Sequence, residues 1–359
     1  MKSLSTIIST GYSADEVKFL SRLGQRPFRK PEYTESYSGL QAKPAVEEGI
    51  RMLESADTAA MSQKLALLDR AATYFRHALH LKPDYELAHR QLGKTMFNKE
   101  LSLARQEGCQ GFGEPFMLRA NTGRAKGVGV VLVHDYGAKP GQMRQLGEHL
   151  QRRGYWVYGM RLPGHGRSHH SLDYSRPCEW FNTVEDAFWL MNEMTSRTVV
   201  VGQGIGAILA LLLGAHLREV SGIISLAAPV KLKAYWMRLA PMLYPMVKYR
   251  MQKLYNENNK AYHRYIPIKS IGGMRGLIFE FPPHLRRVTC PVLLMQSRKD
   301  DFSYANKSPQ IIAGKVNSRV CRIRYAGDKY VLTEKNSDQE QINEICADFV
   351  SEITNGGKR

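Results

Sequence analysis

Five cysteine thiols are the softest metal ligands and strongest nucleophiles in this sequence, so their spacing decides which chemistry they could support. They are odd in number, widely spaced and free of any Cys-x-x-Cys pair: Cys109, Cys178, Cys290, Cys321 and Cys346. Such spacing predicts neither a disulfide framework nor a zinc site. A thiol nucleophile also needs a partner histidine, and nothing in the sequence pairs one with these cysteines. We therefore expect no metal and no cofactor.

A second chemically suggestive group lies in residues 231–289, which carry 12 basic and 2 acidic side chains. Lys248 and Arg250 are set among methionines and aromatic residues such as Trp236 and Tyr244. Adaptable apolar side chains between basic groups can face an apolar ligand, a partner helix or an anionic membrane surface. A helix whose apolar face covers the core and whose lysines are solvated fits the pattern equally well.

The elements that must position such groups alternate in type along residues 125–353. Short apolar runs predict strands at Val128–Val133, Tyr155–Met160, Thr198–Val201, Ile223–Leu226, Val292–Gln296 and Val320–Tyr325. Helical spacings lie between them, around Met143 to Leu150 and at Trp180–Met194, Ile205–His216 and Gln339–Ile353. This alternation predicts an α/β fold with a doubly wound, mostly parallel sheet.

Residues 1–120 form a separate helical N-terminal region in this interpretation. Ala71, Phe75, Ala78 and Pro83 resemble the second-helix signature of a tetratricopeptide repeat, and Leu92-Gly93 falls where the Leu-Gly pair of the next repeat belongs. The resemblance covers little more than one repeat, whereas a repeat array generally needs three or more. We favour a helical hairpin packed on the main domain over a peptide-binding array. Residues 1–41 show no clear periodicity, and no role is predicted for them.

Several motifs of residues 121–359 occur in an order that resembles one branch of the α/β-hydrolase superfamily, the monoacylglycerol lipases and bacterial carboxylesterases. They are Val131-Leu-Val-His134-Asp135-Tyr136-Gly137, Arg161-Leu-Pro-Gly-His165-Gly166, Val199-Val-Val-Gly202-Gln203-Gly204-Ile205-Gly206, Ala227-Ala-Pro229 and Pro291-Val-Leu-Leu-Met-Gln-Ser-Arg-Lys-Asp300. The resemblance implies an α/β-hydrolase fold with a cap insertion at about 231–289, over a pocket for an apolar or acyl ligand.

The same resemblance implies where a catalytic triad would lie. Gly204 falls on the nucleophile of the family's Gly-x-Ser-x-Gly turn, Asp300 on the acid and Tyr330 on the histidine base. Glycine has no atom that could attack a carbonyl, and a phenol with a pKa of about 10 accepts protons poorly at neutral pH. Asp300 then has no base to orient. We predict that the triad is degenerate and that no catalytic residue is intact.

The oxyanion hole that the resemblance implies is altered as well. Asp135 stands where the family has glycine, and its carboxylate beside the Tyr136 N–H would oppose the negative charge that the hole must stabilise. The second donor, the Ile205 N–H, is a backbone group and survives side-chain substitution. Gln203 follows the strand as a polar residue near the pocket floor. We predict that these four residues line the ligand pocket.

Other polar residues of these motifs have structural interpretations. In the family, the histidines that match His134 and His165 tie loops together, and we expect the same here. Tyr330 is expected to be a packing residue with its hydroxyl bonded to Asp300.

Composition and charge narrow the classes of function. With 43% hydrophobic and 23% charged residues, the 359-residue chain is typical of soluble globular proteins. Its net charge of +18 is not accompanied by a nucleic-acid recognition motif, so we expect no nucleic-acid partner. We identify no secretory signal, and the longest apolar run, residues 204–215, is about half of what a bilayer-spanning helix needs. A cytoplasmic location is predicted.

Two functions follow from these observations. The first is a pseudoenzyme that binds a ligand in the inherited pocket, with the N-terminal helices as a surface for a protein partner and the cap facing an anionic membrane. The alternative is an active carboxylesterase or lipase-type ester hydrolase with a rearranged nucleophile. Labelling by a serine-directed fluorophosphonate separates the two.

Overall fold

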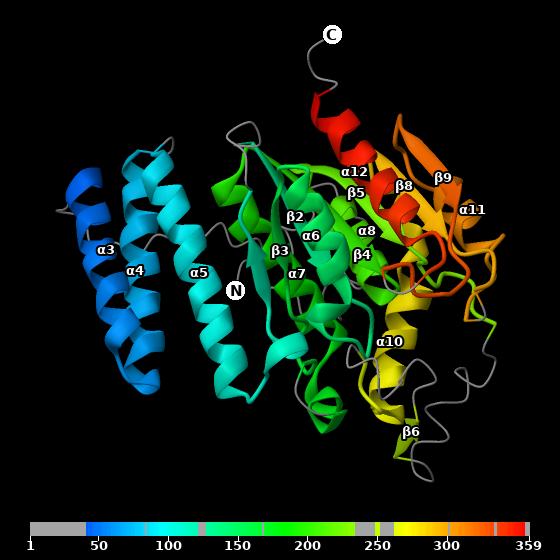
Figure 1. The fold of residues 1–359 in the computed structure, drawn as a ribbon, viewed down its shortest axis with the longest axis horizontal. Helices are drawn as coiled ribbons and strands as arrows, with labels where there is room; N and C mark the ends of the chain where they lie inside the picture. Colours follow the sequence, from blue (N-terminus) through cyan, green and yellow to red (C-terminus); the bar gives the residue numbers. More distant parts are fainter. Residues whose placement is uncertain are drawn as a thin grey trace, which may run out of the picture.

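The computed structural model describes residues 41–82, 85–120, 127–166, 169–233, 248–251, 262–300, 302–333 and 336–355. A group of N-terminal helices lies beside a larger layered α/β part (Figure 1). The repeat-signature residue Pro83 and the part of the predicted cap that holds Trp236 and Tyr244 lie outside the described residues.

The α/β part is built on a seven-stranded sheet with the order β1-β3-β2-β4-β5-β8-β9. Its strands are β1 (Phe116–Leu118), β2 (Val128–Val133), β3 (Trp156–Gly159), β4 (Arg197–Gln203), β5 (Val220–Leu226), β8 (Val292–Gln296) and β9 (Cys321–Tyr325). All neighbouring strands pair in parallel except β1, which is antiparallel to β3. The predicted doubly wound, mostly parallel sheet is confirmed, with β1 as an additional edge strand that begins before residue 121.

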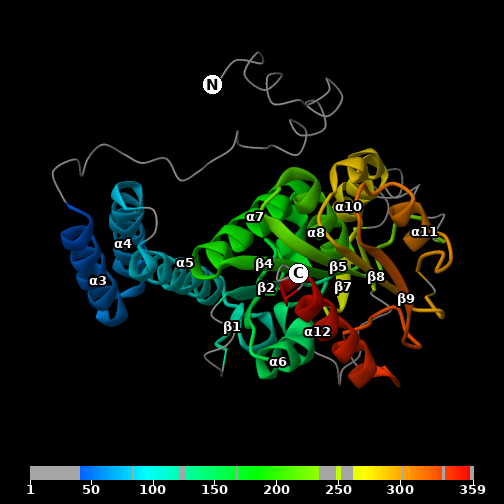
Figure 2. The ribbon, with the colours of Figure 1, turned by 90° about the horizontal axis from the view of Figure 1, so that it is seen from above.

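Helices cover both faces of the sheet (Figure 2). On one face lie α6 (Arg144–Arg152) and α12 (Gln339–Asn355), and on the other lie α7 (Pro177–Met194), α8 (Ile205–His216) and α10 (Ile268–Glu280). The two cores follow from the alternation of strand side chains, because Val131 and Val133 belong to the α8 side whereas Val130 and Leu132 belong to the α6 side.

Shorter elements complete the α/β part at the ends of the strands. They are the 3-10 helices η2 (Gly111–Gly113), η4 (Pro140–Met143), η5 (His169–Tyr174) and η7 (Pro282–Arg287), the helix α11 (Ser308–Ala313), and the antiparallel pair β6 (Tyr249–Met251) and β7 (Tyr265–Pro267). Within the predicted cap insertion, therefore, the described residues form β6, β7, α10 and η7.

The N-terminal region contains α3 (Ala42–Thr58), α4 (Met61–Leu81) and α5 (Glu86–Gln106). Ala71, Phe75 and Ala78 of the repeat-like pattern are all buried between these helices. Gly49 of α3 leaves room for the Phe75 ring, because a Cβ there would lie 2.6 Å from the nearest ring carbon. The N-terminal region therefore contains three described helices where a hairpin was predicted. The third of them, α5, packs against α7. The tetratricopeptide assignment stays a prediction.

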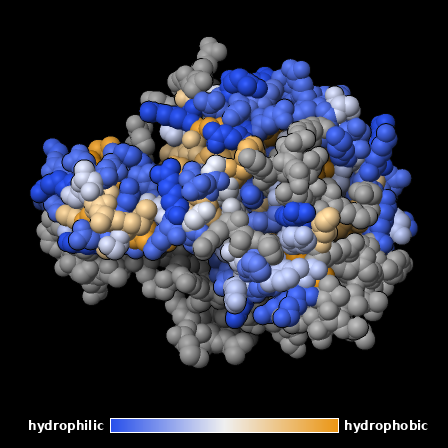
Figure 3. Space-filling view, turned by 60° about the horizontal axis from the view of Figure 1, so that its bottom comes forward, coloured by the Kyte–Doolittle hydropathy of each residue, from blue (hydrophilic) through white to orange (hydrophobic). Residues whose placement is uncertain are grey.

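The described surface is mainly hydrophilic in the view of Figure 3, with hydrophobic areas on the lobe formed by the N-terminal helices. Large apolar side chains exposed on these helices are Met61, Leu81 and Leu87. None of the helices among the described residues combines the length and the apolar character needed to cross a membrane.

The bundle predicts how Phe75 and Met61 contribute to stability. Replacing the fully buried Phe75 with alanine should lower the free energy of unfolding by about 3 kcal/mol or more, because it leaves a cavity beside Gly49. The control Met61→Ala, at an exposed position, should change it by less than about 0.5 kcal/mol. Urea denaturation followed by helical circular dichroism measures both. Equal curves for the two variants would contradict this packing of α3 on α4.

Candidate functional site

The glycine-rich turn between β4 and α8 lies beside the carboxyl end of β2, where Val133 pairs with Gly202. Close backbone contacts require both flanking glycines. A Cβ on Gly202 would lie 2.1 Å from the Gly206 carbonyl oxygen, and one on Gly206 would lie 2.3 Å from that of Val133. Gly204 at the centre has φ 58° and ψ −116°, a conformation that favours glycine. The sequence therefore forms the tight strand-to-helix turn that was predicted.

The space above Gly204 is filled by the side chain of Asp135. A Cβ on Gly204 would lie 2.1 Å from Asp135 Oδ1 and 2.4 Å from the Tyr330 hydroxyl. Asp135 Oδ1 accepts hydrogen bonds from the Ile205 N–H at 2.9 Å and the Tyr136 N–H at 2.7 Å. One carboxylate oxygen thus binds both backbone donors that were predicted to form an oxyanion hole. The sequence predicted that the Asp135 carboxylate would oppose the negative charge of an oxyanion. In the structure, this carboxylate itself occupies the oxyanion hole.

Tyr330 closes the other side of this site. Its side chain is buried, its ring lies 5.3 Å from that of Phe302, and its hydroxyl donates to the Asp135 carboxylate. Gln203 braces the Tyr330 loop, because its Nε2 donates to the Tyr330 carbonyl at 3.3 Å and its Oε1 accepts from the Leu332 N–H at 3.2 Å. Tyr330 is a packing residue, as predicted, but its hydroxyl partner is Asp135 rather than Asp300.

Asp300 does not bond Tyr330 because its own loop already occupies its carboxylate. Oδ1 accepts from the Phe302 and Ser303 N–H groups at 2.8 and 2.9 Å. Oδ2 accepts from Gln296 Nε2 at 2.5 Å and from the Ser303 hydroxyl at 2.6 Å. Burial nevertheless raises the pKa of Asp300. This carboxylate braces the loop after β8.

His134 and His165 tie the loops around the site together, as predicted. His134 Nε2 accepts from the Leu162 N–H at 3.1 Å, and His165 Nε2 accepts from the Gly137 N–H at 3.0 Å. Each Nδ1 lies within 3.0 Å of a carbonyl oxygen, so both rings are neutral with the proton on Nδ1. Burial lowers the pKa of His134 to about 3 and that of His165 well below its ordinary value. Neither ring is available as a base.

Sequence reasoning missed two residues that hold Asp135 in place. The Asp135 N–H donates to Gln142 Oε1 at 2.8 Å, and Gln142 Nε2 donates to the Tyr262 hydroxyl. Both side chains are buried. Gln142 is seven residues from Asp135 and Tyr262 comes from the predicted cap, and neither belongs to any of the motifs, so no sequence signal connected them.

The electrostatics of the site centre on Asp135. Burial raises its pKa from 3.8 to about 7, against hydrogen bonds from Ile205, Tyr136 and Tyr330 that favour the charged form. Burial also raises the pKa of Tyr330 well above its ordinary value, so this phenol stays protonated and acts as a donor. The arrangement therefore contains a buried carboxyl group that titrates near neutral pH and a hydroxyl donor, with no nucleophile side chain at position 204.

Thiols and metal ligands add no further chemistry to this site. Burial raises the pKa of Cys290 and Cys346 to about 12, which leaves these thiols protonated and unreactive. Among the described residues, no group of three or more His, Cys, Asp or Glu side chains could hold a metal ion.

Comparisons with known proteins agree with the fold. Residues 124–330 match the protein family described as Hydrolase_4, serine aminopeptidase, S33. A thermostable monoacylglycerol lipase of Bacillus sp. (strain H-257) is 27% identical over 228 residues, which cover 62% of this chain and 90% of the lipase. A carboxylesterase of Bacillus subtilis (strain 168) is 20% identical over 230 residues, or 62% of this chain and 92% of the esterase.

Solved structures show the fold. A structure reported for LipS and LipT, two metagenome-derived lipolytic enzymes, superposes with a TM-score of 0.63 at 21% identity, covering 68% of this chain and 99% of the other. The monoacylglycerol lipase of Paleococcus ferrophilus gives 0.55 at 16% identity, covering 67% and 98%. The seven-stranded sheet and its helices thus form an α/β-hydrolase fold, as the sequence predicted.

The raised pKa of Asp135 predicts a pH-dependent effect of Asp135→Asn, which keeps an oxygen acceptor and removes the charge. Wild type binds a proton on folding between pH 3.8 and about 7, so its stability falls as pH rises through this window. Asp135→Asn lacks this loss and should gain a few kcal/mol over wild type between pH 4 and pH 8. Urea denaturation of both proteins across this range measures the difference. A difference independent of pH would contradict the buried carboxylate.

Proposed function

The chain belongs to the serine aminopeptidase S33 family, Hydrolase_4, and from this premise we propose that it is a ligand-binding member that has lost serine-hydrolase activity. One observation carries the proposal: the Asp135 carboxylate lies above Gly204 and accepts hydrogen bonds from both backbone donors. A substrate carbonyl would have to displace this carboxyl oxygen before the donors could stabilise an oxyanion.

Three separate obstacles to hydrolysis support the proposal. Gly204 supplies no nucleophilic atom, and Tyr330 is a protonated phenol at the position proposed for the base. The third obstacle is the occupied donor pair, since loss of one such donor typically costs about 3 kcal/mol of transition-state stabilisation. Because catalytic groups act as a unit, repair of any single obstacle leaves the others in force.

The alternative, an active ester hydrolase with a rearranged nucleophile, has one group at this position, the Asp135 carboxylate. A carboxylate can act as a nucleophile in some enzymes. Here Oδ1 accepts two backbone hydrogen bonds and the carboxylate also accepts the Tyr330 hydroxyl, which lowers the electron density available for attack. These internal hydrogen bonds therefore weaken the case for Asp135 as a rearranged nucleophile.

The ligand class is proposed from the relatives. The relatives described above are a monoacylglycerol lipase, a carboxylesterase and lipolytic enzymes, and a yeast monoglyceride lipase of the same fold was solved with a substrate analogue. We propose a small apolar or acyl molecule for this chain as well. Its proposed setting is cytoplasmic, with an anionic membrane facing the cap.

A protein partner is proposed at the N-terminal helices. Leu81 at the end of α4 and Leu87 at the start of α5 both expose large apolar side chains at the same end of the bundle. Apolar groups exposed at one end of a helical hairpin suit contact with another protein.

Wild-type chain should release no p-nitrophenol from short-chain esters above a heat-denatured control, and a fluorophosphonate probe should not label it. The reason is the absence of a serine oxygen at position 204 together with the occupied donors. Turnover by the purified wild-type chain above that control would refute the loss of activity, and its disappearance in Asp135→Asn would identify the rearranged nucleophile.

Rebuilding the missing chemistry tests the placement of the site. The first change is Asp135→Gly, which makes room for a side chain at position 204, because a Cβ there would lie 2.1 Å from the Asp135 carboxylate. Gly204→Ser and Tyr330→His then add a nucleophile and a base beside free donors. We expect fluorophosphonate labelling and ester hydrolysis in this triple variant and neither in the double variant that retains Asp135. Labelling of the double variant as strong as that of the triple would contradict the account of Asp135.

A further inference from the structure

A cavity of about 320 Å³ lies between the end of η5, the first turn of α7 and the first half of α10. Its wall includes Asp173, Tyr174 and Arg176 on the chain leading into α7, and Lys269, Ser270 and Gly273 on α10. The volume falls in the range of pockets for small organic ligands. Nothing in the function proposed above uses this cavity.

The charge of the wall favours an anion. Arg176 and Lys269 come from different elements, and within the described part of the chain neither forms an ion pair with a carboxylate. The one acidic residue among those that line the cavity, Asp173, accepts the Tyr249 hydroxyl at 2.9 Å, and that hydroxyl also bonds His170. The wall of the cavity therefore carries two cations against one carboxylate, an excess of one positive charge.

The acidic side chain in the first turn of α7 also accepts a hydrogen bond. Glu179 accepts a hydrogen bond from the Arg176 N–H at 2.9 Å and caps the helix. The 18-residue α7 directs its positive N-terminal end toward the same region, which adds to the potential of the two cations.

The cavity lies where α10 packs closely on the start of α7, and its rim offers an apolar surface. Gly273 lets α10 approach α7 closely, since a Cβ there would lie 3.1 Å from the Pro177 ring. At the rim, Tyr174 is 83% exposed, and its ring offers an apolar face beside the cations.

We propose that this cavity binds the anionic group of a small organic ligand, a phosphate or a carboxylate, through Arg176 and Lys269, with the ligand's organic part against Tyr174. The two cations supply charge-assisted hydrogen bonds from opposite walls. Ser270 joins this cavity to the first site, because its hydroxyl lies 2.5 Å from the Tyr136 hydroxyl. The inference does not depend on whether the chain hydrolyses esters.

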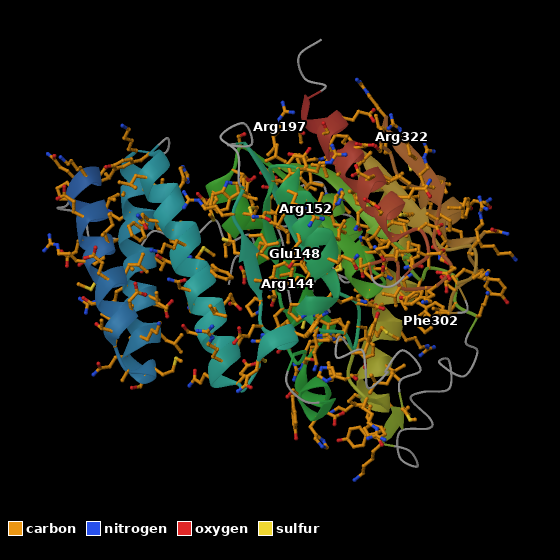
Figure 4. All side chains as sticks on the ribbon, in the orientation of Figure 1. Arg144, Glu148, Arg152, Arg197, Phe302 and Arg322 are labelled. Atoms are coloured by element: carbon orange, nitrogen blue, oxygen red, sulfur yellow. The ribbon has the colours of Figure 1, made fainter. Side chains whose placement is uncertain are left out.

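The test compares the full chain with Arg176→Gln/Lys269→Gln and with the control Arg152→Gln. Arg152 is an exposed arginine on α6 (Figure 4), and α6 lies on the opposite face of the sheet from α10 (Figure 2). The probes are glycerol phosphate, butyrate, and phosphatidylcholine vesicles with and without phosphatidic acid, all at low ionic strength. Calorimetry measures binding of the soluble anions, and sedimentation measures binding to vesicles. Thermal unfolding without ligand verifies that all three proteins fold.

We expect at least one anionic probe to bind wild type and Arg152→Gln equally, to bind the double variant at least tenfold more weakly, and to be displaced by salt. Binding of glycerol phosphate or butyrate identifies a soluble ligand, and binding of phosphatidic acid vesicles alone identifies a lipid head group. Equal affinity of the double variant and wild type would overturn the site, as would failure of every anionic probe to bind wild type.

Discussion

One oxygen of Asp135, held by the backbone N–H groups of Tyr136 and Ile205, sets the chemistry of this protein. It occupies the donors of the turn after β4 and the volume above Gly204, so no residue with a Cβ fits at that position while Asp135 is present. Gly204 in turn depends on Asp135 and Tyr330, because without their side chains the glycine would leave a void in a buried site. The three residues therefore depend on one another, and we infer that their side chains are matched as a set.

The frame around this set is that of a hydrolase. Gly202 and Gly206 keep the close contacts of the turn, and His134 and His165 fasten the neighbouring loops with neutral rings. These interactions hold the backbone of the turn and of the loops in place, so they do not require a nucleophile side chain. The donors consequently stay aligned on one point, and the internal carboxylate satisfies two amides that would otherwise be buried without partners.

Local patterns predicted the frame well. The apolar run of β2 and the glycines around Gly204 carry their own periodic or steric signals, and the resemblance to lipases ordered them into a fold. The partner of Tyr330 was predicted wrongly, because Asp300 is satisfied within its own loop and Asp135 lies far away in sequence. The short strand β1 gave too few residues for an alternating pattern. Gln142 and Tyr262 could not be predicted, since their bond joins segments that only the folded chain brings together.

The occupation of the two amides by Asp135 is tested most directly by nuclear magnetic resonance of the folded wild-type chain. The amide proton shifts of Tyr136 and Ile205 should titrate together with a midpoint near pH 7, following the Asp135 carboxyl, and this titration should vanish in Asp135→Asn. Amide shifts of Tyr136 and Ile205 that stay constant from pH 4 to pH 9, or that titrate unchanged in Asp135→Asn, would show that the donors are not bound to this carboxylate.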